Sequence, residues 1–404
     1  MLNVCTPQEV LTIIHNEFKG STVENEVLPI SNCIGRILAE DITADEYVPD
    51  FNRSTVDGYA VKASDTFGCS DSIPALLTLS GEVKMGEAAD FKISAGDCAY
   101  VPTGAEIPEG ADAVVMIEYS EDYGDGTIGL SKPAAPGSNI IFRGDDVFPG
   151  KCVLKSGRKL RAEDIGALAA MGKAEVAVCK KPRVAVLSTG DELIPHTEKP
   201  KAAQIRDTNS PMLCAAINSY GADAVACGII RDKRELLLDA VKSAAESYDI
   251  IVISGGSSVG MKDATCSVIE ELGTLLLHGI AMKPGKPTII GKIGKKPVIG
   301  LPGHPAAAFF VTDIFIKELI NVMQGAETVR ACVTAKLTEA VSANHGRAQY
   351  TSVILNNDGG ELLAVPIRSK SGLISSLAGA DGYFCIPRDS EGCAKDEEIN
   401  VFLR

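Results

Sequence analysis

Six short segments of the sequence combine glycines, carboxylates and lysines at the ends of apolar runs that are typical of buried strands. They are Ser188–Glu192, Arg206–Ser210, Arg231–Asp232, Ser254–Gly260, Lys283–Pro287 and Leu301–Pro305. Glycine-rich loops at helix N-termini favour phosphate or another oxyanion, because their backbone N–H groups point at the ligand. Carboxylates beside phosphates usually hold Mg²⁺. These residue types therefore predict a site for a phosphorylated or nucleotide-bearing ligand with a divalent metal.

The elements that must position these segments follow a regular alternation from residue 182 to about residue 325. Apolar, strand-like runs alternate with amphipathic, helix-like runs, which is typical of a parallel, doubly wound α/β sheet. Such sheets bind ligands at the carboxyl ends of their strands, so we expect the six segments to converge on one edge. Within this region Ser210 and Pro211 predict the start of one helix, and Asp263 predicts the N-cap of another.

The parts of the chain on either side have a different texture. Residues 46–139 alternate short apolar runs with Gly, Pro and Asp, which predicts a β-rich part with many turns. Residues 327–404 are typical of a small β-barrel or sandwich. Residues 6–18 predict an amphipathic helix, because a capping box precedes an apolar stripe at helical spacing.

Each motif has a simpler structural interpretation when it is taken alone. Ser254–Gly260 lacks both the Gly-Lys-Ser/Thr end of a P-loop and the G-x-G-x-x-G dinucleotide pattern, so alone it indicates a turn. Asp263 alone is a helix cap, and His304 alone is a helix-start residue. Lys283 and Lys286 alone are surface charges around a turn. The expected convergence of all six segments favours the functional interpretation over these alternatives.

Composition limits the class of protein. A formal net charge of −14 over 404 residues argues against a nonspecific binder of nucleic acid or anionic membranes. The twelve cysteines show no Cys-x-x-Cys or zinc-ligand spacing, which predicts free thiols in a reducing compartment. The N-terminus lacks a signal-peptide pattern and no stretch approaches the ~20 apolar residues of a membrane span, so we expect a cytoplasmic protein.

Motifs along essentially the whole chain resemble those of one family. Ser54–Val61, Pro102–Ala105 and Gly110–Val115 match its N-terminal segments, and the six segments above follow in family order. The stretch SKSGLISSLAGADGY matches near the C-terminus. On these residues the chain resembles the MoeA family of molybdopterin molybdenumtransferases, which is related to the E domains of gephyrin and of its plant counterpart.

The resemblance implies a fold of four parts. These are an elongated linker domain of residues 1–45 with 140–180, a β-rich second domain of residues 46–139, a doubly wound MogA/MoaB-like α/β molybdopterin-binding domain of residues 181–326, and a C-terminal β-barrel of residues 327–404. It also implies Mg²⁺-dependent insertion of molybdate into adenylylated molybdopterin, with release of AMP. The implied assembly is a homodimer, and a MogA-like adenylyltransferase is the candidate upstream partner.

Site residues follow from the resemblance by motif match. Catalytic roles would belong to Asp57, Thr103, Glu192, Asp232 and Asp263, and the metal would be held by Glu192, Asp232 and Asp263. Substrate would be bound by Asp207, Thr208, Ser254, Gly255, Gly256, Ser257, Ser258, Gly260, Lys283, Lys286, Pro302, Gly303, Pro305, Arg347 and Ser371. Among these, the residues of the Ser254–Gly260 loop suit phosphate, and the lysines and Arg347 suit molybdate. Asp57 and Thr103 would enter the cleft from the other subunit.

Three departures from the family pattern and two alternative functions stay open. Val56 stands where Met is usual, Ser257 and Ser258 enrich the glycine loop in hydroxyls, and His304 replaces the common Asn. The histidine leaves the choice between molybdate and tungstate open. The alternatives are a MogA-like enzyme that makes the adenylate from molybdopterin and ATP, and a non-catalytic scaffold that has kept the fold.

Overall fold

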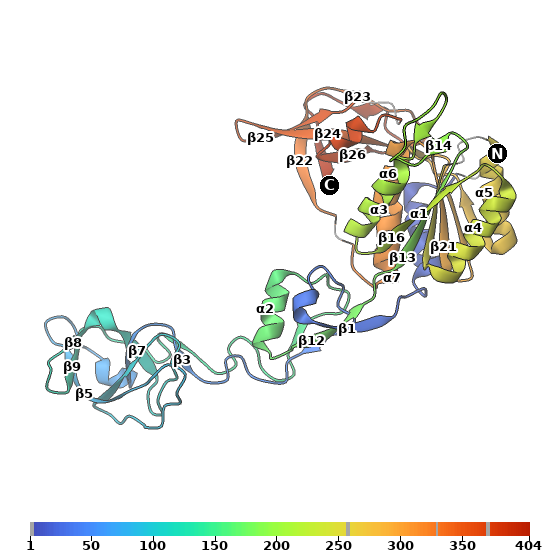
Figure 1. The fold of residues 1–404 in the computed structure, drawn as a ribbon. Coiled ribbons are helices and arrows are strands. Elements are labelled where there is room, and N and C mark those ends of the chain that lie inside the picture. The colour runs from blue at the N-terminus through green and yellow to red at the C-terminus, as the bar shows by residue number, and fades with distance from the viewer. Residues whose placement is uncertain (1–3, 256–258, 329, 369–371) are drawn as a thin grey trace.

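The computed structural model describes residues 4–255, 259–328, 330–368 and 372–404, and of residues 259–263 only the backbone. The chain forms an elongated molecule of four packed units, each with a hydrophobic core (Figure 1). We call them the α/β unit, the linker unit, the distal unit and the C-terminal barrel. This architecture confirms the predicted fold class. The residue boundaries of the four predicted domains stay a prediction.

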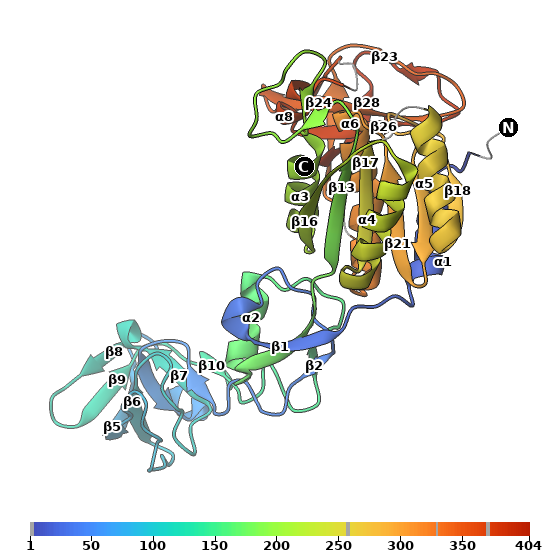
Figure 2. The same ribbon diagram turned by 45° about the vertical axis from the view of Figure 1, so that its right-hand side comes forward.

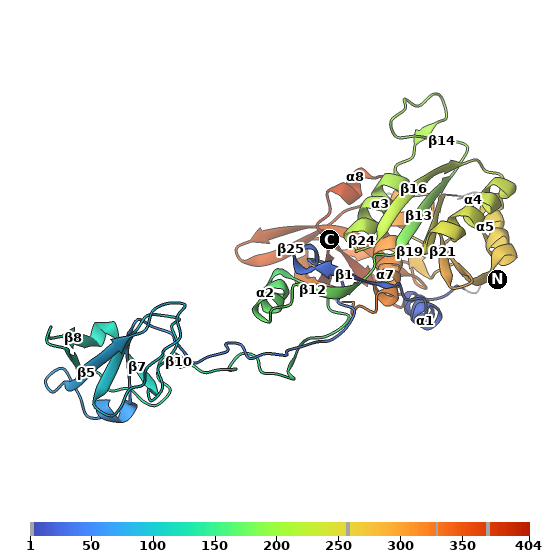
Figure 3. The ribbon, with the colours of Figure 1, turned by 60° about the horizontal axis from the view of Figure 1, so that its bottom comes forward.

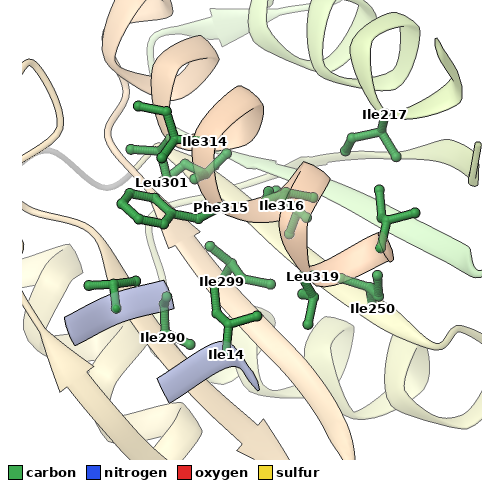
Figure 4. Close-up of a cluster of buried hydrophobic side chains, with 14 of the residues drawn as sticks. Ile14, Ile217, Ile250, Ile290, Ile299, Leu301, Ile314, Phe315, Ile316 and Leu319 are labelled. Carbon is green, nitrogen blue, oxygen red and sulfur yellow. The ribbon is translucent and has the colours of Figure 1, made fainter. Parts of the chain in front are cut away.

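The α/β unit is built on a six-stranded sheet with the order β16-β13-β17-β21-β20-β18. Side chains of β13 alternate between the faces, so Val184 and Val186 enter one core while Ala185 and Leu187 enter the other. Helices α1, α3, α6 and α7 cover the first face, and α4 and α5 cover the second (Figure 2). Figure 4 shows part of the first core, in which strand and helix side chains interdigitate. The sheet is therefore doubly wound, as predicted.

The bounds of these elements follow the predicted runs closely. In chain order they are β13 (Arg183–Thr189), α3 (Asn209–Ser219), β16 (Asp223–Ile230), α4 (Arg234–Ser247), β17 (Ile250–Gly255), α5 (Val259–Leu272), β18 (Thr274–His278), β20 (Ile289–Ile293), β21 (Lys296–Leu301), α6 (Pro305–Val311), a π-helical turn (Thr312–Ile316) and α7 (Lys317–Met323). A small parallel pair, β14 (Leu193–Ile194) and β15 (Ile205–Arg206), lies in the loop after β13.

The sheet departs from the predicted parallel arrangement at one strand near its edge. Strand β20 runs antiparallel to both β21 and β18. Only Gly294 and Lys295 separate β20 from β21, and Gly294 has a φ of +59°, so the connection is a tight hairpin turn. Strands β16, β13, β17 and β21 remain parallel to one another, so their carboxyl ends share one edge.

Two predicted helix starts were also wrong. Helix α3 begins at Asn209 rather than after Ser210, because the Asp207 carboxylate accepts a hydrogen bond from the Ser210 N–H at 3.0 Å and satisfies the first turn. Helix α5 begins at Val259, so Asp263 lies inside it and is not its N-cap. Met261 and Lys262, which precede Asp263, are good helix formers, so the helix extends N-terminally past it despite Gly260.

Helix α1 (Pro7–Phe18) has the predicted capping box and apolar stripe. The Thr6 N–H donates to Glu9 at 2.7 Å, and the Glu9 N–H donates to the Thr6 hydroxyl at 3.3 Å. The stripe Val10, Ile14 and Phe18 is at most 1% exposed and enters the first core of the α/β unit. The helix therefore packs with the α/β unit, although the sequence analysis grouped residues 1–45 with the linker.

Replacing Phe18 by alanine is expected to lower the free energy of unfolding of the α/β unit by about 3–5 kcal/mol, because the buried ring leaves a cavity between helix and sheet. Calorimetric unfolding measures this change. Val27→Ala is the matched control, since Val27 is 64% exposed and its loss leaves no cavity. Equal effects of the two substitutions would contradict the packing of α1 on the sheet.

The linker unit joins the two ends of the molecule. Strand β1 (Asn25–Pro29) pairs antiparallel with β12 (Glu175–Cys179), and β2 (Ile42–Thr43) pairs with β11 (Cys152–Leu154). Helix α2 (Ala162–Ala170) packs Leu168 into the core of this unit. Two extended segments continue from it to the distal unit (Figure 3).

The distal unit is a six-stranded β sheet with the order β7-β4-β6-β5-β9-β8. Glycine is required at Gly58, because a Cβ there would lie 2.0 Å from the Val115 carbonyl oxygen of the neighbouring strand. The bounds of the strands are β4 (Gly58–Val61), β5 (Ala75–Glu82), β6 (Asp97–Val101), β7 (Ala113–Met116), β8 (Ser120–Asp122) and β9 (Thr127–Leu130), with β3 (Arg53–Ser54) and β10 (Ile140–Ile141) pairing at its entrance.

The C-terminal part resolves the choice between barrel and sandwich. Strands β24, β25, β22, β28 and β26 pair in sequence, and β26 pairs again with β24, so the sheet closes into a five-stranded barrel. A short strand of the α/β unit, β19 (Met282–Lys283), adds to its rim by pairing with β24. The bounds are β22 (Cys332–Leu337), β23 (Val341–Ser342), β24 (Ala348–Asp358), β25 (Glu361–Pro366), α8 (Ser375–Ala378), β26 (Gly382–Ile386), β27 (Gly392–Cys393) and β28 (Glu398–Leu403).

The cysteines and the helices bear on two further expectations, free thiols and the absence of a membrane span. All twelve cysteines lie in the described residues, and each is a free thiol, as predicted. Among the described residues, no helix is long and apolar enough to span a membrane.

Candidate functional site

The loops at the carboxyl edge of the α/β sheet meet around the Asn209 side chain. Its amide nitrogen donates to the Ser254 hydroxyl and to the Gly303 carbonyl oxygen, both at 2.9 Å. Beside it, the Ser188 and Ser210 hydroxyls are 2.7 Å apart. The carboxyl ends of β13 and β17, the loop that follows β21 and the start of α3 therefore come together at one place.

A second group at the same edge is acidic. The Asp232 N–H lies 3.4 Å from a carboxylate oxygen of Asp191, and Arg231 lies 3.7 Å from the same carboxylate. Burial raises the pKa of Asp232, and the negative charges of Asp191 and Glu192 raise it further. A carboxylate in such surroundings is stabilised in its ionised form by a cation, so the group suits a hard divalent metal.

The pattern of unsatisfied buried atoms supports a ligand at this edge. In the part of the chain that the structure describes, six buried side-chain polar atoms lack a hydrogen-bond partner. Three of them, Thr189 Oγ1, Asn209 Oδ1 and Asp232 Oδ1, belong to the edge loops. Because buried polar atoms are almost always paired in native proteins, this concentration indicates groups that are completed by a ligand, metal or water.

The described residues do not by themselves complete a metal site. No group of three or more His, Cys, Asp or Glu side chains among them has the geometry to hold a metal ion. The predicted ligand Asp263 lies in α5, and its side chain is outside the described residues. The other two predicted ligands, Asp232 and Glu192, lie within the described residues. The unpaired oxygen of Asp232 fits the role of a metal ligand.

The glycine loop is described only at its two ends. Gly255 has a φ of +123°, and a Cβ there would lie 2.2 Å from the Thr189 carbonyl oxygen, so β13 and β17 end in contact only because this residue is glycine. The structure does not describe Gly256, Ser257 and Ser258, and it describes only the backbone of Gly260. The predicted phosphate cradle therefore stays a prediction.

A cavity of about 840 Å³ lies between the α/β unit and the C-terminal barrel. The α/β unit contributes Lys283, Lys286, Pro302, Gly303 and His304 to its wall. His304 occupies the N-cap position of α6, as its predicted helix-start role requires, and Pro305 is the first residue of that helix.

The barrel supplies the opposite wall and two further cations, Arg347 and Arg368. Pairing of β19 with β24 sets Lys283 opposite Gln349 and Met282 opposite Ala348, and Arg347 immediately precedes β24. Arg368 forms an ion pair with Glu339 at 2.8 Å, which offsets its charge, so Lys283, Lys286 and Arg347 are the cations that we consider for ligand binding in this cavity. The predicted Ser371 lies outside the described residues.

Gly303 connects the cavity with the Asn209 side chain. Its carbonyl oxygen accepts from Asn209, and the residue also lines the cavity. Asp207, whose carboxylate caps α3, and Thr208 immediately precede Asn209. Through Gly303, the start of α3 is thus linked to the wall of the cavity that Arg347 also lines.

Asp57 and Thr103 are not part of this region within one chain. They lie together in the distal unit, where an Asp57 carboxylate oxygen accepts from the Thr103 N–H at 2.7 Å and from its hydroxyl at 2.9 Å. The backbone hydrogen bond first, and the hydroxyl second, lower the pKa of Asp57. The linker unit separates this pair from the α/β unit (Figure 1).

Replacing Thr103 by valine is expected to raise the pKa of Asp57 part of the way back to its ordinary value, because the hydroxyl donor is lost while the backbone donor remains. An NMR titration of the Asp57 carboxyl carbon measures the shift. Thr103→Ser keeps a hydroxyl and is the control. A carboxyl that titrates identically in the valine and serine variants would contradict the assigned role of the hydroxyl.

Sequence reasoning missed three residues of the region. Asn209 stood inside a quoted loop, but its type gave no reason to prefer it over its neighbours. Thr189 lies at the end of a predicted strand, and Arg368 immediately precedes the C-terminal motif. Neither residue belongs to a sequence pattern that marks it as functional. Each is identified by its position: two by an unpaired buried atom and one by lining the cavity.

Comparison with known proteins agrees with this architecture along the chain. Three family models match successive parts: the MoeA N-terminal region (domain I and II) at residues 5–172, a probable molybdopterin binding domain at residues 185–321, and the MoeA C-terminal region (domain IV) at residues 334–403. The matches cover the linker and distal units, the α/β unit and the barrel in turn.

Individual relatives match over their full length. The molybdopterin molybdenumtransferase of Bacillus subtilis is 32% identical over 413 residues, which cover 100% of this chain and 95% of that protein. Two crystal structures of molybdopterin biosynthesis MoeA proteins from Pyrococcus horikoshii have TM-scores of 0.82 and 0.87, at 39% and 32% identity, and cover 99% and 100% of both chains. The chain therefore belongs to the MoeA family of molybdopterin molybdenumtransferases, a family of transferase enzymes.

Proposed function

We propose that this enzyme inserts molybdate into adenylylated molybdopterin in an Mg²⁺-dependent reaction that releases AMP and molybdenum cofactor. The observation that carries the proposal is the cavity lined by Lys283 and Lys286 of the α/β unit and by Arg347 of the barrel, which Gly303 links to the Asn209 side chain. A protein with a net charge of −14 that places these three cations around one cavity is suited to an anionic substrate.

Molybdate is a compact dianion, so its site needs fixed cations and N–H donors. Lys283 and Lys286 lie in a Pro-Gly loop of the α/β unit, and Arg347 lines the same cavity from the barrel, so cations of both units could bind one oxyanion. By the family resemblance, Ser371 and the segment Pro302–Pro305 complete this part of the site.

The adenylate would lie along the carboxyl edge of the sheet. Its phosphates suit the backbone N–H groups of the loop Ser254–Gly260 at the start of α5, and Asp207 and Thr208 would position the pterin. Asn209, which connects three loops, would hold these parts at a fixed spacing. Such fixed spacing lowers the entropic cost of bringing molybdate and adenylate together.

Asp232 and Glu192 would hold the divalent cation. The family resemblance adds Asp263 as a third ligand. When bound, Mg²⁺ would neutralise the negative charge that develops on the phosphate as AMP leaves. The unpaired buried oxygen of Asp232 and its raised pKa support this assignment, since a bound cation would stabilise the ionised carboxylate.

We further propose a homodimer in which Asp57 and Thr103 of one subunit reach the cleft of the other. Both residues belong to the family's motifs, yet within one chain the linker unit keeps them away from the edge loops. The hydrogen bonds from Thr103 lower the pKa of Asp57, which favours its ionised form, the form that a role beside a metal would require. The proposed location is the cytoplasm, where free thiols persist.

The main alternative is a MogA-like adenylyltransferase, because its α/β fold is shared with this unit. It would consume ATP and molybdopterin to form the adenylate. The scaffold alternative is less favoured, since the carboxylates Asp57, Glu192, Asp232 and Asp263 are all present.

A single-turnover assay tests the proposal and separates it from both alternatives. Purified protein, molybdopterin adenylate and Mg²⁺ are mixed with and without molybdate, and AMP and metal-loaded pterin are quantified. We expect molybdate-dependent AMP release that is lost in Asp263→Asn. A parallel reaction contains molybdopterin and ATP in place of the adenylate. Formation of the adenylate there, without AMP release in the first reaction, would establish the adenylyltransferase instead. The absence of both activities would favour the scaffold.

A further inference from the structure

Behind the cavity, the Asp313 carboxylate accepts one hydrogen bond from each of two tyrosines. The Tyr220 hydroxyl donates to Oδ1 at 2.9 Å, and the Tyr383 hydroxyl donates to Oδ2 at 2.7 Å. Asp313 lies in the π-helical turn between α6 and α7 and is 9% exposed. Burial is the main cause of raised pKa values for both tyrosines, so both remain protonated donors.

The two tyrosines come from different units. Tyr220 is the C-cap residue of α3, so its bond to Asp313 stays within the α/β unit. Tyr383 lies on β26 of the barrel, so its bond joins the barrel to the helix that begins at the cavity loop. Arg330, in the segment that connects the two units, donates to the Tyr383 hydroxyl at 3.1 Å and to the Ile314 carbonyl oxygen at 2.7 Å.

The Tyr383 ring is also continuous with the cavity wall. It lies edge-on to Phe310, with ring centroids 5.2 Å apart, and 6.1 Å from the ring of Tyr350. Phe310 and Tyr350 both line the cavity. The Arg404 guanidinium lies 5.9 Å from the Tyr383 ring and donates to the Ser352 hydroxyl, which also lines the cavity.

We propose that Tyr383 is a positioning residue that, through Asp313, holds the barrel at the distance from the α/β unit at which cations of both units act on one oxyanion. The cavity's cations belong to two units, and a two-residue ladder between β19 and β24 is a second hydrogen-bonded connection near them. Such a short ladder is weak by itself, whereas a buried hydrogen bond to a carboxylate is strong. This inference rests on the proposed function only for its catalytic consequence.

Hydrogen exchange measures the positioning directly and without substrate. Tyr383→Phe removes the hydroxyl that crosses between the units and keeps the ring. Amides of the ladder, including the Ala348 N–H that donates to Ala281, are expected to exchange roughly tenfold faster in this variant. Tyr220→Phe is the matched control, because it removes a hydroxyl from the same carboxylate without crossing between units. Equal exchange at the ladder in both variants, or no change in Tyr383→Phe, would overturn the proposal.

Kinetics test the consequence for the reaction. Tyr383→Phe is expected to raise the KM for molybdate roughly five- to tenfold. It should leave kcat at saturating molybdate close to that of the unaltered enzyme, while Tyr220→Phe changes neither. A fall in kcat with an unchanged KM would overturn the positioning role. If the unaltered protein releases no AMP with molybdate, the proposed function fails, yet the exchange measurement still decides whether Tyr383 holds the two units together.

Discussion

Replacing Lys283 by alanine is expected to reduce kcat/KM for molybdate on the order of 100-fold, mainly through a higher KM. Lys283 lies at the junction of the two units, on the strand that pairs with the barrel, and its side chain lines the cavity. Removing it leaves a dianion with one fewer cation in a site partly screened from water. The single-turnover assay, run over a range of molybdate concentrations, measures the change.

The control for this prediction is Lys295→Ala. Lys295 is an exposed lysine of the same unit, in the turn between β20 and β21, and it does not line the cavity. Its removal alters the net charge of the protein equally, so it reports the general electrostatic effect. Comparable losses in the two variants would mean that overall charge, rather than a cation at the cavity, governs molybdate binding.

Arg347→Ala provides a second and more stringent test of the same geometry. If Lys283 and Arg347 contact one oxyanion from two units, their removal cannot be independent. The double variant is therefore expected to lose less activity than the product of the two single losses. Strict additivity would place the two cations at separate ligands.

Most of the α/β unit could be predicted from the sequence because its physics is local. Alternation of apolar strands and amphipathic helices is visible in the residue order, and the capping box of α1 depends on residues three apart. The antiparallel placement of β20 depends on a two-residue turn, Gly294–Lys295, whose glycine and lysine were not distinctive enough to recognise.

Helix starts were harder to predict because they depend on which side chain caps the first turn. Ser210 and Asp263 are both good caps by type, yet Asp207 caps α3 and α5 begins before Asp263. The packing of α1 on the α/β unit also could not be predicted, since the apolar stripe specifies a buried face but not the surface that buries it.

Parts of the candidate site were predictable from the topology of the parallel sheet. Parallel strands bring their carboxyl ends together, so the loops after β13, β16, β17 and β21 were expected to meet. The contribution of Arg368, the coupling of Lys283 to Arg347 through β19 and β24, and the Asp313 connection depend on how the barrel docks. No spacing within the chain encodes that docking, which explains why these residues emerged only from the structure.

Asp232→Asn is expected to abolish molybdate-dependent AMP release, with a loss on the order of 100- to 1,000-fold, and at the same time to stabilise the folded protein at neutral pH. Burial and the neighbouring Asp191 and Glu192 raise the pKa of Asp232 in the folded state. The folded protein then holds this proton more tightly than the unfolded chain, so ionising the carboxylate costs stability as pH rises above the ordinary aspartate range. Asparagine removes that cost together with the charge that would hold the cation.

The gain in stability should depend on pH in a defined direction. It is complete above the raised pKa of folded Asp232 and disappears as pH falls below the ordinary aspartate pKa, where both states of the unaltered protein are protonated. Thermal unfolding across this range measures it, with Asp239→Asn, an exposed carboxylate on α4, as the control. Added Mg²⁺ should raise the unfolding temperature of the unaltered protein more than that of Asp232→Asn. An Asp232→Asn variant that is less stable at neutral pH and equally responsive to Mg²⁺ would show that this carboxylate serves the fold rather than the reaction.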